Sequence, residues 1–186
     1  AAVPAVGPAL KNNFPEVKAF TRLFPVSGIA SYESGEHGTI AFREEKMQIT
    51  DPAVFEVFDI HLLKGDRLNS LQGPQKTVIS QRAAKKYFGE EDPMGKTISW
   101  DGMRKFEVTG LFENLPNNSH IKFDFLFSYE TLNKESQNES ETNWDWYDFN
   151  TYVLLQQGTS VTELQAKWDK WLFKTRGEEW RKQNSK

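Results

Sequence analysis

Three stretches within residues 51–110 decide the fold. They read D-P-A-V-F-E-V-F-D-I-H-L-L-K-G-D (51–66), T-V-I-S-Q-R-A-A-K-K-Y-F-G-E-E-D-P-M-G-K-T-I (77–98) and F-E-V-T-G (106–110). Residues 76–79, which run into the second stretch, are predicted to form a strand, and the Ser80 hydroxyl can cap a helix of residues 81–88. Gly89 can take the left-handed conformation that ends such a helix. A strand–cap–helix–glycine unit is therefore expected here.

A β-hairpin is expected next. Asp101-Gly102 is the pair that a two-residue type I′ turn prefers, because both central residues need a positive φ. This turn would join strands of residues 96–100 and 103–109. Upstream, Asp51 can accept hydrogen bonds from the free N–H groups of the following turn, and Pro52 suits a first helical position. A short helix ending near residue 58 follows from this pattern.

Hydrophobic periodicity predicts the remaining elements. They are a helix of residues 8–14, strands of residues 17–24, 39–49, 122–127 and 151–155, and a last helix that begins with the capping box Ser160-Val161-Thr162-Glu163. Its apolar face should hold Val161, Leu164, Trp168, Trp171 and Leu172. Residues 27–38 are rich in Gly, Ser and Glu and are expected to form a loop with at most a short strand near residues 30–32. Residues 133–143 are polar and are expected to be a mobile loop.

Composition limits the class of protein. The chain has 186 residues with 38% hydrophobic residues, a length sufficient to bury a sizeable core. The net charge of -3, with both signs interspersed, lacks the basic stripe that nucleic acid would require. There is no cysteine, so disulfides and thiolate chemistry are excluded, and no apolar run is long enough to cross a bilayer. The Pro- and Ala-rich start and the charged end are expected of a piece of a longer protein.

The sequence contains few signals for chemistry. Gly95-Lys96-Thr97 lacks the strand–loop–helix setting of a phosphate-binding loop, and three acidic residues at 90–92 precede it. His37, His61 and His120 lack metal-ligand spacing. Three groups of carboxylates leave a glycosidase-like pair open, although solvated charges are favoured: Glu44-Glu45, Glu90-Glu91-Asp92, and Asp145 with Asp148. We therefore predict no catalytic, cofactor-binding or metal-binding residue.

One aromatic segment is a candidate partner surface. Trp144, Trp146 and Tyr147 alternate with acidic residues. Such aromatics can stack on sugars or form a partner-binding edge. The alternative, which we favour, is a loop that folds its aromatics onto the core. A secreted or periplasmic glycan- or peptide-binding module using these three residues is the second functional hypothesis.

Further stretches of the sequence occur in the same order and at the same spacing as in members of a known family. These are P-A-L-K-N-N-F-P-E-V (8–17), L-P-N-N-S-H-I-K-F-D-F-L-F-S-Y-E-T-L (115–132) and T-Y-V-L-L (151–155), so with the three stretches above the match spans most of the chain, from residue 8 to residue 155. In this order they resemble the MacB-like periplasmic core domain of MacB/FtsX-type ABC transporter permeases, in the group found in Bacteroidetes-like bacteria. The order and spacing of the pieces carry the resemblance, since no single piece is decisive.

The resemblance implies both a fold and a function. The fold would be α+β with two lobes, a porter-like βαβ lobe of residues 1–58 plus 148–186 and an inserted β-rich lobe of residues 59–147. The function would be that of a non-catalytic extracytoplasmic domain that couples cytoplasmic ATP hydrolysis to periplasmic conformational change. It would lie in the periplasm as part of an inner-membrane protein, with both chain ends at one end of the molecule.

The resemblance also implies partners. These are a cytoplasmic ATPase subunit, reached through transmembrane helices and holding the ATP, a second permease copy, and a periplasmic adaptor protein, with no nucleic acid and no cofactor in this domain. A third hypothesis, an enzyme of unrecognised type, predicts a concave pocket with convergent reactive groups.

Overall fold

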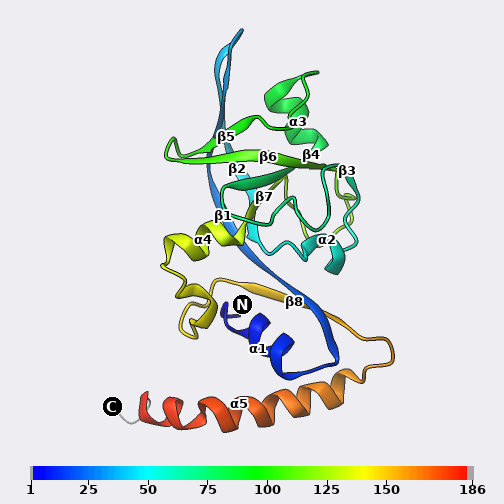
Figure 1. The fold of residues 1–186 in the computed structure, drawn as a ribbon, viewed down its shortest axis with the longest axis vertical. Coiled ribbons are helices and arrows are strands. Elements are labelled where there is room, and N and C mark those ends of the chain that lie inside the picture. Colours follow the sequence, from blue (N-terminus) through cyan, green and yellow to red (C-terminus); the bar gives the residue numbers. More distant parts are fainter. Residues whose placement is uncertain (1, 184–186) are drawn as a thin grey trace.

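The computed structural model describes residues 2–183 and has an α+β fold, as expected (Figure 1). The helices are α1 (Val6–Asn13), α2 (Val54–Val57), α3 (Gln81–Phe88), α4 (Tyr129–Glu135), the 3-10 turn η1 (Ser140–Thr142) and α5 (Val161–Gln183). The strands are β1 (Val17–Ser34), β2 (Gly38–Thr50), β3 (Leu62–Lys64), β4 (Lys76–Ser80), β5 (Thr97–Trp100), β6 (Arg104–Phe112), β7 (Phe125–Ser128) and β8 (Asn150–Leu155). No helix in this described part is both long and apolar enough for a membrane span.

One mixed sheet joins all eight strands. Along its main path the order is β2-β7-β4-β6-β5-β1-β8, with β3 paired to β6. β4 runs parallel to β6 and β2 runs parallel to β7, whereas the other pairs are antiparallel. The 18-residue strand β1 changes partner along its length. It pairs with β8 over residues 17–23 and with β2 over residues 23–34.

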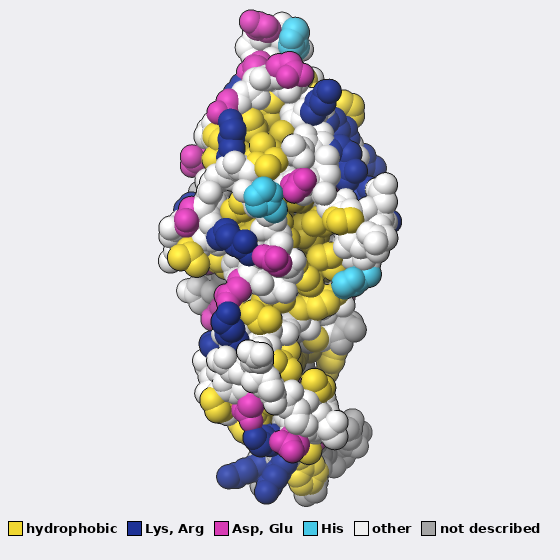
Figure 2. Space-filling model, turned by 90° about the vertical axis from the view of Figure 1, so that its right-hand side faces the viewer, with side chains coloured by type: hydrophobic (Ala, Val, Ile, Leu, Met, Phe, Trp, Pro, Cys, Tyr) yellow, Lys and Arg dark blue, Asp and Glu magenta, His cyan; other side chains and the backbone are white. Residues whose placement is uncertain are grey.

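The far part of the β1–β2 hairpin is an arm. We define the arm as residues 28–44, from the Gly28–Glu44 pair to the turn at residues 35–37. Its tip extends beyond the rest of the molecule (Figure 1), and acidic and histidine side chains gather at that end (Figure 2). The prediction of a loop over residues 27–38 is therefore wrong. Pairing with β2 keeps this Gly- and Ser-rich segment extended, because long-range hydrogen bonds outweigh weak local strand preference.

Two local predictions are confirmed. The Ser80 hydroxyl accepts a hydrogen bond from the Ala83 N–H at 3.1 Å, and Gly89 ends α3 with a φ of 60°. β5 and β6 form the expected hairpin, in which Asp101 and Gly102 have φ values of 51° and 70°. The connection spans residues 101–103 rather than the two residues predicted, because Trp100 pairs with Arg104. The positions of the cap and of the hairpin were predictable because a cap or a tight turn depends on neighbouring residues.

Aromatic side chains fill the main core. Trp100, Phe106 and Phe127 lie in mutual contact at 4.5–6.4 Å between ring centroids, and Tyr87 and Phe88 of α3 are buried in the same cluster. A second cluster centres on residues of α2, β4, β6 and β7. Its buried members are Leu23, Val54, Phe55, Ile60, Leu71, Val78, Phe112, Phe123 and Leu126.

A smaller third cluster joins α1, β8 and α5. Phe14, Val17 and Leu164 are buried there, and Trp168 and Trp171 pack against them with stacked rings 5.2 Å apart. The predicted apolar face of α5 is thus largely confirmed, but Val161 is exposed and does not belong to it. The first described residues and the end of α5 both lie in this lower half of the molecule, opposite the arm tip (Figure 1), the arrangement that the resemblance implied.

Two further predictions require correction. Residues 133–143 do not form an open loop, because they include the end of α4 and η1, and Ser140 is 1% exposed. Asp51 does not cap α2 through its side chain, since the N-cap position is Ala53 and makes no side-chain cap hydrogen bond. The Asp51 carboxylate faces Arg22 instead.

The two-lobe division stays a prediction. Strands from both proposed segments pair in the single sheet, for instance β2 with β7 and β1 with β5. The third hydrophobic cluster nevertheless sets the α1–β8–α5 end apart from the main core.

Candidate functional site

The predicted aromatic surface is not one flat face. Trp146 packs on Phe24 and Phe149 at centroid distances of 5.1 and 5.0 Å, and its indole N–H donates to Asp148 at 2.8 Å. Trp144 is half-buried next to Trp171, 6.4 Å away. Of the three aromatics only Tyr147, 63% exposed, is open to solvent. The glycan- or peptide-binding hypothesis loses its main support, because two of its three aromatics contact the protein.

Glu44 and Glu45, one of the carboxylate groups singled out in the sequence, belong to two separate ion pairs. Glu44 accepts from Lys86 and the Tyr87 hydroxyl, each at 2.7 Å, whereas its neighbour Glu45 pairs with Arg43 in solvent. Burial and the adjacent Glu44 raise the pKa of Tyr87. These contacts make Glu44 part of the link between the arm and α3 rather than half of a catalytic pair.

The remaining sequence motifs do not converge either. Lys96 pairs with Glu91 and donates to the Tyr32 hydroxyl at 3.1 Å, and Thr97 begins a strand rather than a helix. His37 lies at the arm tip, whereas His61 contacts Glu113 at 3.2 Å. Within residues 2–183 no group of three or more His, Asp or Glu side chains could hold a metal ion.

Hollows on the surface offer no obvious reaction centre. One of about 530 Å³ lies between the arm and α3. Its lining includes Tyr32, His37, Lys85, Lys86, Glu90 and Glu91. Lys86 in this lining is already paired with Glu44. The convergent acid, base or nucleophile that an enzyme hypothesis requires is not found around it.

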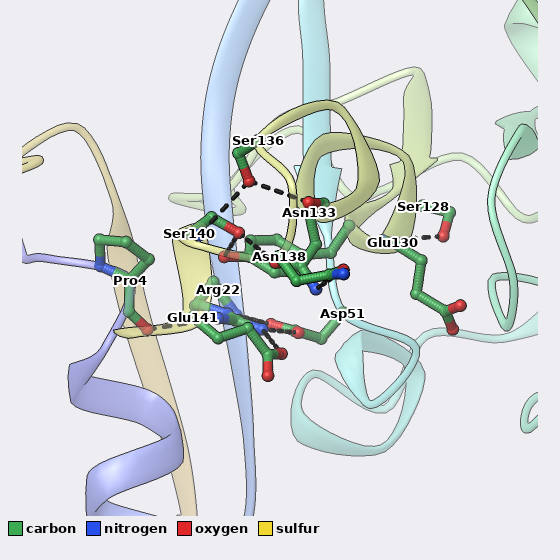
Figure 3. Close-up of polar contacts among 11 residues, drawn as sticks. Pro4, Arg22, Asp51, Ser128, Glu130, Asn133, Ser136, Asn138, Ser140 and Glu141 are labelled. Atoms are coloured by element: carbon green, nitrogen blue, oxygen red, sulfur yellow. Dashed lines mark hydrogen bonds and ion pairs between the residues drawn. The ribbon is translucent and has the colours of Figure 1, made fainter. Parts of the chain in front are cut away.

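A buried cluster around Arg22 is the feature that sequence reasoning missed (Figure 3). Arg22 is 1% exposed, and its backbone N–H and Nε donate to Asp51 Oδ2 at 2.7 and 2.9 Å. Nη2 donates to Asp51 Oδ1 at 2.5 Å and lies 3.4 Å from Glu141 Oε1, whereas Nη1 donates to the Pro4 carbonyl at 3.2 Å. The guanidinium carbon lies 3.5 Å from the centre of the Tyr129 ring. One cation therefore joins five separate segments of the chain.

Electrostatics keep this cluster charged. Burial alone lowers the pKa of Arg22, but the hydrogen bonds and charge of Asp51 outweigh burial and raise it. Burial raises the pKa of Tyr129, against the opposing effect of Arg22. A buried guanidinium with a bidentate carboxylate and a stacked ring is the arrangement for which arginine is suited.

The sequence held only a faint signal for this cluster. Arg22 sits in the alternating segment of residues 17–24, where its face also carries Lys18 and Phe20, and so it looks like a solvent-facing residue. Asp51 precedes a proline and looks like a helix cap. The pairing of the two depends on how β1 and β2 align, which neither residue reveals.

Comparison with known proteins identifies the family. The sequence profile of the MacB-like periplasmic core domain matches residues 3–170. The chain belongs to this family. None of the curated proteins compared with it matches significantly. The relationship of this MacB-like domain to known proteins therefore rests on the family profile and on solved structures.

Three solved structures are similar to the MacB-like domain. A domain assigned to a permease protein from Porphyromonas gingivalis has a TM-score of 0.74 and 25% identity over 95% of this chain and 77% of its own. The periplasmic region of MacB from Actinobacillus actinomycetemcomitans has a TM-score of 0.68 and 18% identity, covering 92% and 72%. The extracellular domain of the ABC-type transporter YknZ from Gram-positive bacteria has a TM-score of 0.58 and 18% identity, covering 84% and 74%. The last two support the fold alone.

These findings establish a coarse functional assignment. The chain is a MacB-like periplasmic domain of an ABC transporter permease. Its relatives are periplasmic or extracellular parts of transporters and permeases.

Proposed function

We propose that this domain is non-catalytic and couples ATP hydrolysis in the cytoplasm to a conformational change in the periplasm. ATP would be bound by a separate nucleotide-binding subunit, with no cofactor in this domain. Family membership supports this proposal, as does the lack of convergent reactive groups around the hollow between the arm and α3.

The observation that carries the proposal is the continuity of β1. This strand begins beside α1, β8 and α5, in the half of the molecule that holds both chain ends, and runs to the arm tip (Figure 1). A strand with interstrand hydrogen bonds along its length is stiff. A small movement at the chain ends can therefore become a larger movement of the arm.

The proposal implies specific partners. The chain ends would connect through transmembrane helices to the cytoplasmic ATPase subunit, and a second permease copy would complete the transporter. The arm and the neighbouring hollow next to α3 are the surface on which a periplasmic adaptor or a substrate would be handled. The two-lobe arrangement would let the α1–β8–α5 end move relative to the main core.

Spin labelling of the full-length permease with its ATPase subunit tests the coupling. This chain has no cysteine, so Glu36→Cys places one label at the arm tip of each protomer once any cysteines elsewhere in the permease and the ATPase subunit have been replaced. We expect the distance between the two labels to change on the order of 5 Å or more between the nucleotide-free state and a non-hydrolysable ATP analogue. The same label at Lys170→Cys on α5, near the chain ends, is the matched control and should move less.

An identical Glu36 distance distribution in both nucleotide states would contradict the coupling proposal. Equal movement at Glu36 and Lys170 would contradict the role of β1 as a lever, because a rigid translation needs no amplification.

A further inference from the structure

Helix α5 lies at the end of the molecule opposite the arm tip. It runs across the molecule rather than along its longest axis, and the first described residues lie in the same half (Figure 1). The proposed function connects both chain ends to transmembrane helices, so this end of the domain would face the membrane. α5 is therefore the long helix placed nearest to lipid.

α5 has an inner face that packs on the protein and an outer face that does not. On the inner face Leu164 is 7% exposed, and the rings of Trp168 and Trp171 lie 6.0 and 6.4 Å from that of Phe14. The outer face consists of residues that are all exposed and recur at the spacing of one helical side, namely Ala166, Lys170, Phe173 and Lys174. Phe173 is 63% exposed. The helix thus presents an aromatic ring and two lysines on the side that faces away from the domain.

The two lysines of the outer face are not neutralised by ion pairs. Lys167, on the neighbouring side of α5, pairs with Glu16. In the part of the chain that the structure describes, Lys170 and Lys174 have no such partner. Asp169 adjoins the outer face, and its carboxylate accepts a hydrogen bond from Gln165 at 2.8 Å. The outer face therefore carries an excess of positive charge.

Charge is also distributed unevenly along the molecule. Acidic and histidine side chains gather at the arm tip, whereas Lys and Arg side chains gather at the lower end (Figure 2). Glu33 and Glu36 of the arm are exposed. An anionic surface would attract the α5 end and repel the arm tip. This distribution favours the orientation in which α5 lies next to an anionic membrane and the arm points away from it.

We propose that the outer face of α5 rests on the anionic headgroups of the membrane that holds the permease. The proposal rests on the proposed function, from which it takes the membrane attachment of the chain ends. Lys170 and Lys174 contact lipid phosphates, while their alkyl chains and the Phe173 ring reach the apolar boundary below the headgroups. Two lysines and one ring bind lipid weakly by themselves, but a tethered domain stays close to the bilayer, so a weak contact is sufficient. The contact supports the base of the lever that β1 forms.

Fluorescence quenching in lipid nanodiscs tests this contact in the full-length permease with its ATPase subunit. After replacement of any other cysteines, Ala166→Cys carries a fluorophore on the outer face, and Glu36→Cys carries the same fluorophore at the arm tip as the water-exposed reference. A nitroxide on the lipid headgroup should quench the Ala166 label at least about threefold more strongly than the Glu36 label, because an interfacial helix lies at headgroup depth. Iodide in the water should quench the two labels in the opposite order.

Two results of this experiment would overturn the proposal. One is equal headgroup quenching of the Ala166 and Glu36 labels. The other is an Ala166 label shielded from both quenchers, since a second copy or another protein, rather than lipid, would then cover α5.

Charge reversal tests the role of the two lysines. Lys170→Glu combined with Lys174→Glu should lower headgroup quenching of the Ala166 label at least about twofold in nanodiscs that contain phosphatidylglycerol. Lys85→Glu combined with Lys105→Glu is the matched control, because it reverses the same charge at exposed lysines outside α5 and should leave the quenching unchanged. An equal loss in both double variants, or no loss in either, would contradict an electrostatic contact at α5.

The quenching and spin-label experiments separate this inference from the proposed function. An arm that moves with nucleotide while the Ala166 label stays free of lipid would overturn the membrane contact and leave the coupling intact. An α5 in contact with lipid and an arm that does not move would keep the contact and overturn the coupling.

Discussion

The part of β1 around Arg22, which we call the root, differs from the arm tip at residues 35–37, which follows the other end of β1, in the burial and in the contacts of its charged side chains. At the root, Arg22 is 1% exposed and contacts four other segments of the chain. At the tip, His37 and Glu36 are 3.9 Å apart with side chains 71% and 84% exposed. Both ends carry charged residues, but only at the root does the removal of one partner leave a charge stranded away from water. The comparison teaches that this strand is anchored at one end and free at the other.

The largest expected effect is at the root. Arg22→Met keeps much of the side-chain volume but leaves Asp51 buried without its cation, so we expect the free energy of unfolding to fall by about 3–5 kcal/mol. Urea denaturation followed by tryptophan fluorescence measures this. Arg43→Met, which breaks the exposed Arg43–Glu45 pair on the arm, should change it by less than about 0.5 kcal/mol.

The double variant Arg22→Met, Asp51→Leu sharpens the same test. It removes both charges, so it should be more stable than Arg22→Met alone. If Arg22→Met and Arg43→Met proved equally mild, the root would not be anchored by this ion pair.

Matched threonine substitutions come next. The hydroxyls of Thr21 and Thr50 share a buried hydrogen bond of 2.9 Å at the root, whereas Thr39 on the arm bonds to exposed Glu33 at 2.9 Å. Thr21→Val should lower the free energy of unfolding by about 1–3 kcal/mol, because the buried Thr50 hydroxyl loses its Thr21 partner and keeps only the 3.5 Å bond to the Asp51 carbonyl. Thr39→Val should cost less than about 0.5 kcal/mol. A larger loss at Thr39 than at Thr21 would reverse the comparison.

Alkaline pH gives a third test at the root. Burial raises the pKa of Tyr129 above its ordinary value of 10.0, although Arg22 opposes this. The stability that depends on the neutral hydroxyl is therefore complete below pH 10.0 and is lost as pH rises through the folded-state pKa. Tyr129→Phe should lose about 1 kcal/mol at neutral pH with the Ser140 hydrogen bond, and its stability should fall less steeply above pH 10.

The exposed Tyr147 supplies the control for that measurement. Unfolding of Tyr147→Phe at neutral and alkaline pH should match the unaltered chain. An unchanged alkaline slope in Tyr129→Phe would mean that the Tyr129 hydroxyl does not contribute to the pH dependence.

The smallest effect is expected at the tip. Within the described residues the ion partner of Glu36 is the exposed His37 alone, so Glu36→Gln should change the free energy of unfolding by less than about 0.5 kcal/mol. Any larger loss in denaturation would show that the tip is held by contacts comparable to those of the root.

Sequence reasoning succeeded where a signal is local. Ser80 and Asp101-Gly102 specified a cap and a turn because each acts on residues next to it in the chain. It failed at Gly28, which looked like a loop residue. Gly28 is buried against Trp100, where an added Cβ would collide with the indole ring. The absence of a side chain here permits close packing of β1 on β5, and composition alone does not distinguish this use of glycine from a flexible one.

The candidate site shows the same division. The aromatic segment was visible because Trp144, Trp146 and Tyr147 are adjacent, but whether they face solvent depended on packing partners such as Phe24 and Trp171, which are distant in sequence. Ser140 lies in a polar segment that looked mobile, and its burial depends on the Tyr129 hydroxyl and on Asn133. The polarity of this segment therefore suggested mobility, and the contacts that order it could not be read from its composition.

By itself the sequence determined the α+β class, the caps and turns, the helical face of α5 and the family, because these depend on neighbouring residues, periodicity and the order of short stretches. Only the tertiary structure decided that β1 continues for 18 residues and that Arg22 meets Asp51 beneath Tyr129. The reason is physical. A strand is stabilised by hydrogen bonds to partners far along the chain, and a charge can be buried only where the fold brings its opposite charge within contact distance.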